Sequence, residues 1–294
     1  MSACRALLLL AGLLTAAGLS ACPAEAPPAP RDDGVLDYVA LGDSYAAAPR
    51  LPADDPSVPC SRSKANYPSL VADRFAPVHL TDVSCVGAMT AHLTKEQVSG
   101  DTTVPPQLDA LSEDTDLVTV TIGGNDKGLF PTWYDCRQLR SSDPKGSPCA
   151  DAQRDELLRL MPKIQRNLVA ALTEIQVRAP DAVVIVATYP QVFPDRGTCE
   201  LASAYAKGDL AYINSIVESL SEAMIAAARE TGVVWVDVHA ASSGHDVCSK
   251  EPWVNGFTQE ETQDQTRATV LHPFPEEQAA VARLILDKLV LPEP

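Results

Sequence analysis

Apolar residues along the chain follow two different patterns. In four short segments they are almost continuous and rich in β-branched residues, which predicts strands that are buried on both faces of a parallel sheet. A fifth and weaker segment, 78–83, predicts a further strand. The four clear segments are 35–41, 116–122, 182–188 and 233–238.

Other segments place their apolar residues at helical spacing instead. Pro162 lies inside the longest of them, so we expect that helix to bend or to start again there. The segment 133–148 has no such spacing, and we expect a loop closed by its own cysteine pair. Because strands alternate with helices, the pattern predicts an α/β fold with a parallel sheet covered on both faces. The predicted helices are 67–75, 151–178, 205–231 and 276–290.

The first 21 residues have the pattern of an export signal. Arg5 precedes an apolar run that is too short for a comfortable membrane span, and Leu19-Ser20-Ala21-Cys22 resembles a bacterial lipobox. We therefore expect residues 1–21 to be a lipoprotein signal peptide and Cys22 to be lipidated. The protein would then be exported and held to a membrane of the cell envelope. The alternative is an ordinary signal peptide and full secretion.

The rest of the chain predicts one linker and one domain. Residues 22–33 are rich in proline and alanine, which is typical of an extended spacer. Residues 34–294 contain no second linker and no internal repeat, and their number suits one α/β domain.

The net charge restricts the possible partners. It is −16 for the whole chain, and loss of the signal removes Arg5 and no acid, which gives −16 − 1 = −17. A surface of this sign repels nucleic acid and gains little from anionic lipid. We expect no nucleic-acid partner, and we expect a monomer.

Six cysteines remain beyond Cys4 and Cys22. An even number in an exported chain predicts disulfides, although six cysteines allow fifteen pairings. The chain has no CxxC motif and no His/Cys cluster with zinc spacing, so we expect no metal and no cofactor. We favour pairing between nearest neighbours in sequence, which gives Cys60–Cys85, Cys136–Cys149 and Cys199–Cys248.

Three of the predicted strands end at turns that contain glycine. These turns hold Ser44, Gly87 and Asn125, and in a parallel sheet they would lie at one edge and could converge on one pocket. Taken singly, Ser44 could be a helix cap and Gly124-Asn125 a simple turn. Together with His272, which precedes the last predicted helix, they are the residue types of an acyl-transfer site.

These segments resemble, in order and spacing, the four sequence blocks of the SGNH/GDSL hydrolase family. The resemblance covers essentially the whole mature domain, and other stretches are similar to the secreted actinobacterial branch of esterases and lipases. The four blocks are Gly42-Asp43-Ser44-Tyr45, Ser84-Cys85-Val86-Gly87-Ala88, Gly123-Gly124-Asn125-Asp126 and Leu271-His272-Pro273. The other stretches are Asn66-Tyr67-Pro68-Ser69-Leu70, the strand that leads into Gly123, and Gly244-His245-Asp246-Val247-Cys248.

The resemblance implies a flavodoxin-like three-layer α/β/α fold and a role for each matched residue. Ser44 would be the nucleophile and His272 the general base. The oxyanion hole would consist of the backbone N–H groups of Ser44 and Gly87 and the side-chain amide of Asn125. The secreted branch also has three disulfides paired in sequence order, as favoured above.

The implied activity is that of a secreted serine ester hydrolase that cleaves acyl or lipid esters through an acyl-serine intermediate. The same scaffold also allows an O-deacetylase acting on carbohydrate or cell wall, or an acyltransferase. A non-catalytic surface binding protein is a further alternative.

Two positions depart from the family pattern. The family commonly has an aspartate three residues before the histidine, where this chain has Thr269. We expect a Ser–His dyad whose imidazole is oriented by a backbone carbonyl in 269–271, with Thr269 as the candidate; spacing gives no support to Asp246 or Asp264. After His272-Pro273 the chain continues with Phe274-Pro275, which changes the rim of the site.

The remaining histidines have ordinary interpretations. His245 is the one rival base, because its surroundings also resemble the family. The others are expected to be ordinary surface or core residues: His79, His92 and His239.

Overall fold

The computed structural model describes residues 34–51, 59–153, 155–258 and 267–289. The expected signal peptide 1–21, Cys22 with the linker 22–33, and Asp264 lie outside these residues. No helix within the described ranges is both long enough and apolar enough to span a membrane.

The described residues form a parallel five-stranded sheet of strand order β2-β1-β5-β6-β7. All five predicted strands are confirmed. Because every strand runs the same way, their carboxyl ends meet at one edge of the sheet. The strands are β1 (Leu36–Gly42), β2 (Val78–Asp82), β5 (Leu117–Thr121), β6 (Val183–Ala187) and β7 (Val234–Val236).

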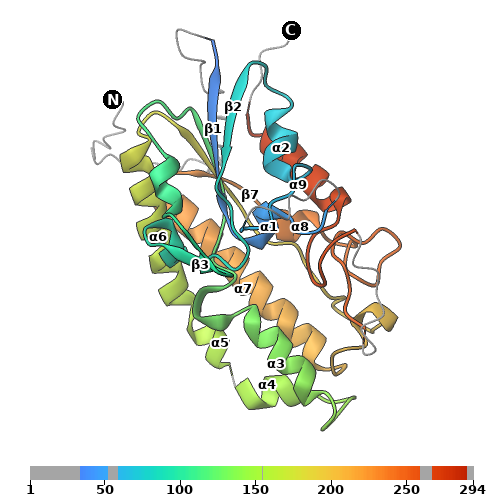
Figure 1. Ribbon diagram of the computed structural model, residues 1–294. Helices are drawn as coiled ribbons and strands as arrows, with labels where there is room; N and C mark the ends of the chain where they lie inside the picture. The colour runs from blue at the N-terminus through green and yellow to red at the C-terminus, as the bar shows by residue number, and fades with distance from the viewer. Residues whose placement is uncertain (1–33, 52–58, 154, 259–266, 290–294) are drawn as a thin grey trace, which may run out of the picture.

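Helices cover both faces of the sheet, as Figure 1 shows. The helices α6 (Met161–Arg178) and α7 (Asp209–Thr231) pack on the face that holds Val39 and Val120. On the other face, α2 (Tyr67–Ala72) and α9 (Pro275–Leu286) pack against alternate residues of the same strands. The three-layer α/β/α fold is therefore confirmed.

The expected helix 151–178 is divided into three. The structure has α4 (Pro148–Gln153), α5 (Glu156–Arg159) and α6, which begins with Pro162 in its first turn, where the missing N–H costs no hydrogen bond. The restart near Pro162 is thus confirmed.

The prediction of a loop over 133–148 is wrong for 133–139 and right for 140–147. Residues Pro131–Leu139 form α3, with proline at its first position and Trp133 and Cys136 buried. This helix is short and carries apolar residues on a narrow stripe, which a search for long periodic runs overlooks. The disulfide Cys136–Cys149 joins α3 to α4.

The other elements are short. The hairpin of β3 and β4 had no sequence signal. The 3₁₀ helices are η1 (Thr90–Leu93), η2 (Gln107–Ala110), η3 (Asp126–Gly128) and η4 (Glu200–Ala202); the rest are β3 (Gln97–Ser99), β4 (Thr102–Val104), α1 (Ser44–Ala47) and α8 (Val238–Ala241). The cysteines are joined in the favoured pairs, Cys60–Cys85, Cys136–Cys149 and Cys199–Cys248.

Candidate active site

Ser44 lies on a sharp turn at the carboxyl end of β1. The turn depends on Gly42, whose φ of +149° is rare for side chains with a Cβ. A Cβ at this position would also lie 2.6 Å from the carbonyl oxygen of Thr121. The side-chain amide of Gln107 binds both the N–H and the carbonyl of Gly42, at 2.8 and 2.9 Å. Ser44 is thereby presented at the start of α1.

His272 is in direct contact with Ser44, although 228 residues separate them in the sequence. The Nε2 atom of His272 is 2.8 Å from the Ser44 Oγ. On the other side of the ring, Nδ1 is 2.8 Å from the carbonyl oxygen of Val270. Because a carbonyl only accepts hydrogen bonds, Nδ1 carries the proton and Nε2 is left to accept the hydroxyl proton of Ser44.

The carbonyl that orients the imidazole belongs to Val270, so the choice of Thr269 is wrong. The Thr269 carbonyl instead accepts the backbone N–H of His272 at 3.1 Å. Asp246 is not brought to the site, since its carboxylate accepts the backbone N–H of Cys248. His245 is likewise occupied elsewhere, with its ring stacked on Trp253 and its Nδ1 2.8 Å from the Glu251 carbonyl.

Several contacts hold the loop that carries His272. Leu271 has a φ of +59°, an unusual conformation for a branched residue. Its carbonyl accepts the Tyr45 hydroxyl at 2.6 Å, and the Tyr45 ring stacks on His272 with 5.5 Å between ring centroids. Asn255 makes two backbone hydrogen bonds to this loop, one to Leu271 and one to His272. Asn255 was not singled out from the sequence, because it lies in a segment that has no regular spacing.

Asn125 lines the same cavity as Ser44 and His272, and a hydrogen bond orients its side-chain amide. Its Nδ2 donates to the carbonyl of Ala88 at 3.0 Å, which joins the turn after β5 to the segment after β2. Gly87, next to Ala88, has a φ of +75°. Within the described part of the chain, the backbone N–H groups of Ser44 and Gly87 have no hydrogen-bond partner. Gly87 is not among the residues that line the cavity at Ser44.

A buried carboxylate lies behind these groups. Asp43 is fully buried, and burial raises its pKa to about 7. Its oxygens accept the backbone N–H of Tyr45 at 2.9 Å and the hydroxyl of Tyr189 at 2.5 Å. Tyr189 comes two residues after β6 and was not predicted as a site residue; its place at the end of a strand is the signal that could have identified it.

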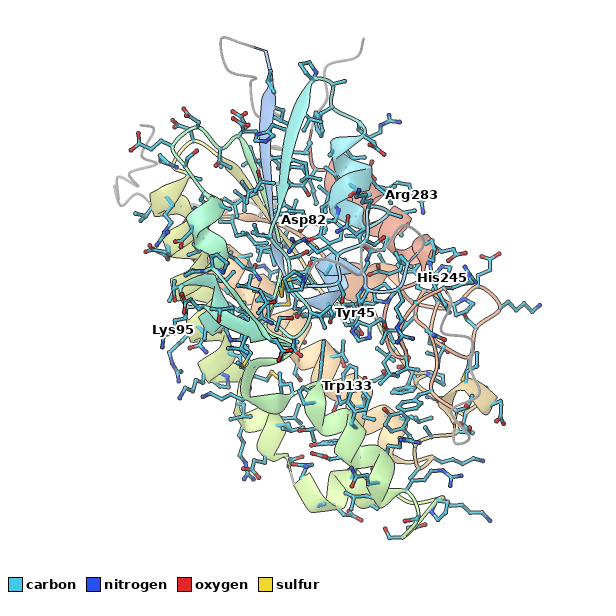
Figure 2. The ribbon with its side chains drawn as sticks, viewed as in Figure 1. Tyr45, Asp82, Lys95, Trp133, His245 and Arg283 are labelled. Atoms are coloured by element: carbon cyan, nitrogen blue, oxygen red, sulfur yellow. A yellow bond between two sulfur atoms is a disulfide. The ribbon has the colours of Figure 1, made fainter. Side chains whose placement is uncertain are left out.

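The cavity at Ser44 has a volume of about 140 Å³. Its walls are mainly aromatic, and Figure 2 labels two of the wall residues, Tyr45 and Trp133, in the centre of the molecule. The ring centroids of Phe130 and Trp133 are 4.3 Å apart, so these walls pack on each other. The lining residues are Ser44, Tyr45, Asn125, Phe130, Pro131, Trp133, Tyr134, Leu271 and His272.

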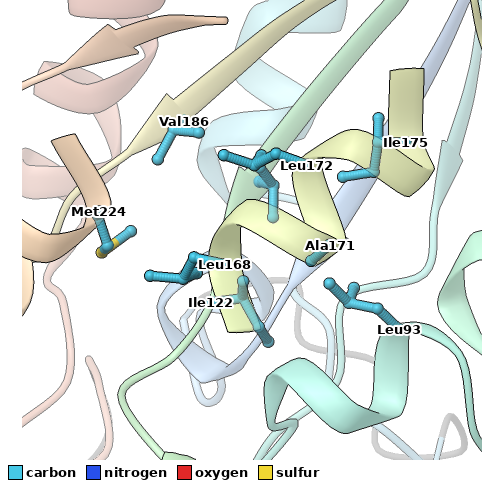
Figure 3. Close-up of a pocket in the computed structure, with 9 residues that line it drawn as sticks. Leu93, Ile122, Leu168, Ala171, Leu172, Ile175, Val186 and Met224 are labelled. Atoms are coloured by element: carbon cyan, nitrogen blue, oxygen red, sulfur yellow. The ribbon is translucent and has the colours of Figure 1, made fainter. Parts of the chain in front are cut away.

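A second cavity lies between the sheet and α6, as Figure 3 shows, and it carries no chemistry. All nine of its lining residues are apolar, among them Ile122 and Leu168. Its volume of about 10 Å³ is at the lower limit for one water molecule, which would find no polar partner there. It is a packing void.

The chain is similar to known proteins over most of its length. It is 42% identical to lipase 2 of Streptomyces coelicolor over 244 residues, which are 80% of this chain and 78% of that protein. Two crystal structures are also similar. They are a phospholipase A1 from Streptomyces albidoflavus (25% identity, TM-score 0.71, covering 86% of this chain and 98% of the other) and an extracellular lipase from Streptomyces rimosus (27% identity, TM-score 0.69, covering 86% and 99%).

The family match includes every residue of the site just described. It extends over residues 40–279, from the middle of β1 to the first turns of α9, and so contains both Ser44 and His272. The chain therefore belongs to the GDSL-like lipase/acylhydrolase family.

Proposed function

We propose that this ester hydrolase cleaves acyl esters through a covalent intermediate on Ser44. The observation that carries the proposal is the contact of 2.8 Å between Ser44 Oγ and a His272 Nε2 that must accept the proton. A serine hydroxyl is a weak nucleophile until a base removes its proton during attack.

In the first half of the reaction, Ser44 Oγ attacks the ester carbonyl carbon while its proton moves to His272 Nε2. The tetrahedral intermediate carries its negative charge on the former carbonyl oxygen. This oxygen accepts hydrogen bonds from the backbone N–H groups of Ser44 and Gly87 and from the side-chain amide of Asn125. When the intermediate collapses, the alcohol leaves with the proton from Nε2. Water then attacks the acyl carbonyl carbon while its proton moves to His272 Nε2, and the carboxylic acid leaves as Ser44 Oγ takes that proton back.

The carbonyl of Val270 takes the place of a carboxylate in this scheme. It holds the Nδ1–H and so fixes both the tautomer and the plane of the ring. A neutral carbonyl stabilises the imidazolium less than an ionised carboxylate does. Burial also lowers the pKa of His272 below its ordinary value of 6.5, so the ring is neutral and ready to act as a base at pH 7.

The lining of the cavity supports the proposal that the acyl group of the substrate binds there. Aromatic walls favour an apolar chain over a sugar, because they gain from apolar burial and offer few hydrogen bonds to hydroxyl groups. The similar proteins named as lipases and as a phospholipase A1 support lipid esters as the class.

The similar extracellular lipase also supports export of this chain. The lipobox that ends at Cys22 further supports a lipid anchor.

Replacement of Ser44 by alanine tests the proposal most directly. Hydrolysis of p-nitrophenyl butyrate by the Ser44→Ala variant is expected to fall at least about 1000-fold, because the variant lacks the oxygen that forms the acyl-enzyme. Ser243→Ala, at an exposed serine, serves as the control and should keep full activity. Equal activity in the two variants would remove Ser44 from the mechanism.

The pH profile reports the state of His272. Hydrolysis needs the neutral imidazole, which predominates above its pKa, and burial lowers that pKa below 6.5. We therefore expect kcat/KM to rise with pH in the acidic range, with the midpoint of this limb below the ordinary histidine value of 6.5. The Asp43 carboxyl, with a pKa of about 7, is the other group that could produce such a limb. Asp43→Asn removes this carboxyl, and the limb at acidic pH should persist in that variant. A limb centred above pH 7 in both proteins contradicts this assignment.

The cavity volume predicts a preference in acyl chain length. About 140 Å³ is close to the roughly 150 Å³ that holds one benzene ring, or six carbon atoms. Across a series of p-nitrophenyl esters, kcat/KM should rise roughly fourfold per methylene up to about six acyl carbons and then level off.

Trp133→Ala should move that limit to longer chains, since it opens the buried wall of the cavity. Trp235→Ala, on β7 away from the cavity, should leave the limit unchanged. If kcat/KM of the original protein continues to rise with acyl chain length and never levels off, the acyl chain does not enter this cavity.

The lipid anchor has its own test, made on the full-length chain in a bacterial host. The original chain is expected in the membrane fraction, with acyl groups on its N-terminal Cys22 in mass spectrometry, and Cys22→Ala in the soluble fraction. A mature chain without acyl groups, or one that starts at another residue, contradicts the anchor.

A further inference from the structure

We propose that Tyr189 is a positioning residue for this reaction, which fixes the turn that carries Asn125 against the turn that carries Ser44. The inference rests on the proposed function, because it concerns how the nucleophile and the oxyanion donor are held in register. Tyr189 itself is not one of the residues that line the cavity at Ser44.

The sheet brings three strand ends together at this point. The strands β1, β5 and β6 are neighbours, and Ser44, Asn125 and Tyr189 follow them at the same edge. Tyr189 is fully buried there. Its hydroxyl can therefore act on both neighbouring turns without competition from solvent.

The Tyr189 hydroxyl binds one group on each turn. The backbone N–H of Gly124 donates to the Tyr189 oxygen at 2.9 Å, and the hydroxyl donates its own proton to Asp43 Oδ2 at 2.5 Å. Asp43 directly precedes Ser44, and Gly124 directly precedes Asn125. A single oxygen atom thus links the carboxylate of the residue before the nucleophile to the backbone N–H of the residue before the oxyanion donor.

The Asn125 amide lies beside this link and shares with it the Asp43 oxygen that accepts the Tyr189 hydroxyl. Its Nδ2 donates to the Ala88 carbonyl at 3.0 Å and lies 3.5 Å from Asp43 Oδ2. An oxyanion donor acts only within about 2.7–3.1 Å of the developing charge, so a small displacement of this turn weakens the stabilisation. The ground state of the ester carries no such charge, so substrate binding is affected much less.

The ring and the hydroxyl of Tyr189 have separable roles. The ring packs edge-on against Tyr45 and Phe130, with centroid distances of 5.0 and 4.9 Å. Gly124 lies so close to Phe130 that a Cβ on it would overlap the ring, so the turn has little freedom on that side. Tyr189→Phe retains this packing and removes only the bridging oxygen.

Tyr38 is a matched control for the loss of a buried hydrogen bond. It is also fully buried, and its hydroxyl is 2.7 Å from Thr119 Oγ1. It packs on the sheet face covered by α2 and α9, in a cluster that does not include the residues of the cavity. Tyr38→Phe and Tyr189→Phe should therefore lose stability in a similar way, and only the second should affect the reaction.

The experiment compares the two variants in kinetics on p-nitrophenyl butyrate and in inhibition by butylboronic acid. The boronic acid forms a tetrahedral anionic adduct with a serine hydroxyl and so reports on the oxyanion donors. For Tyr189→Phe we expect kcat to fall about 10- to 100-fold, KM to stay within about twofold, and the inhibition constant to rise by a factor similar to the loss in kcat. For Tyr38→Phe, all three values should stay within about twofold, although its melting temperature falls.

Two results overturn the inference about Tyr189. One is a loss of kcat in Tyr38→Phe as large as that in Tyr189→Phe, and the other is a normal kcat and inhibition constant in Tyr189→Phe. Ser44→Ala, measured in parallel, separates this failure from failure of the proposed function. If Ser44→Ala is inactive and Tyr189→Phe is normal, only the role of Tyr189 is wrong; if Ser44→Ala is active, the proposed function is wrong.

Discussion

The site depends on the close approach of β1 and β5 at their carboxyl ends. Gly42 pairs with Thr121 in the sheet, and the next backbone N–H, that of Asp43, donates to the Thr121 carbonyl at 2.9 Å. Only glycine lets the two backbones come this near, because a Cβ on residue 42 would collide with that carbonyl. Ser44 and Asn125 follow these two strand ends, so this backbone contact brings their turns together and the Tyr189 hydroxyl then joins the turns themselves.

The histidine is held in a different manner, by its own loop. In a Ser–His–Asp triad, the side chain of an aspartate orients the ring. Here the backbone carbonyl of Val270, two residues before His272, accepts the Nδ1–H instead. The shape of the loop therefore sets the tautomer. Asn255 and Tyr45 maintain that shape from outside the loop, and the left-handed conformation of Leu271 allows its carbonyl to reach the Tyr45 hydroxyl. Rigidity of the backbone substitutes for a third catalytic side chain.

Sequence patterns predicted most of this architecture because strand burial and turn chemistry are local. The five strands, the turn at Ser44 and the position of His272 could be identified from continuous apolar runs, glycines and family blocks. The group that orients the His272 imidazole could only be narrowed to the backbone carbonyls of 269–271. The choice among these three carbonyls depends on the dihedral angles of the loop. Asn255 acts through contacts with a distant segment, for which the local sequence holds no signal. Tyr189 also acts on distant segments, and only its place after a predicted strand pointed to the site. The helix α3 was missed because its apolar stripe is too short to stand out.

The separation of Ser44 and His272 along the chain has a consequence for biosynthesis. The nucleophile turn belongs to the first strand, and the base precedes the last described helix, α9. Gln278 of α9 binds the Tyr45 carbonyl at 3.0 Å and the Tyr67 backbone N–H at 2.6 Å, so this helix docks directly on the nucleophile turn. In a chain that is synthesised from its N-terminus, Ser44 is present long before His272. The protein therefore gains its general base only when the segment with His272 and α9 has docked, and an incomplete chain cannot hydrolyse esters.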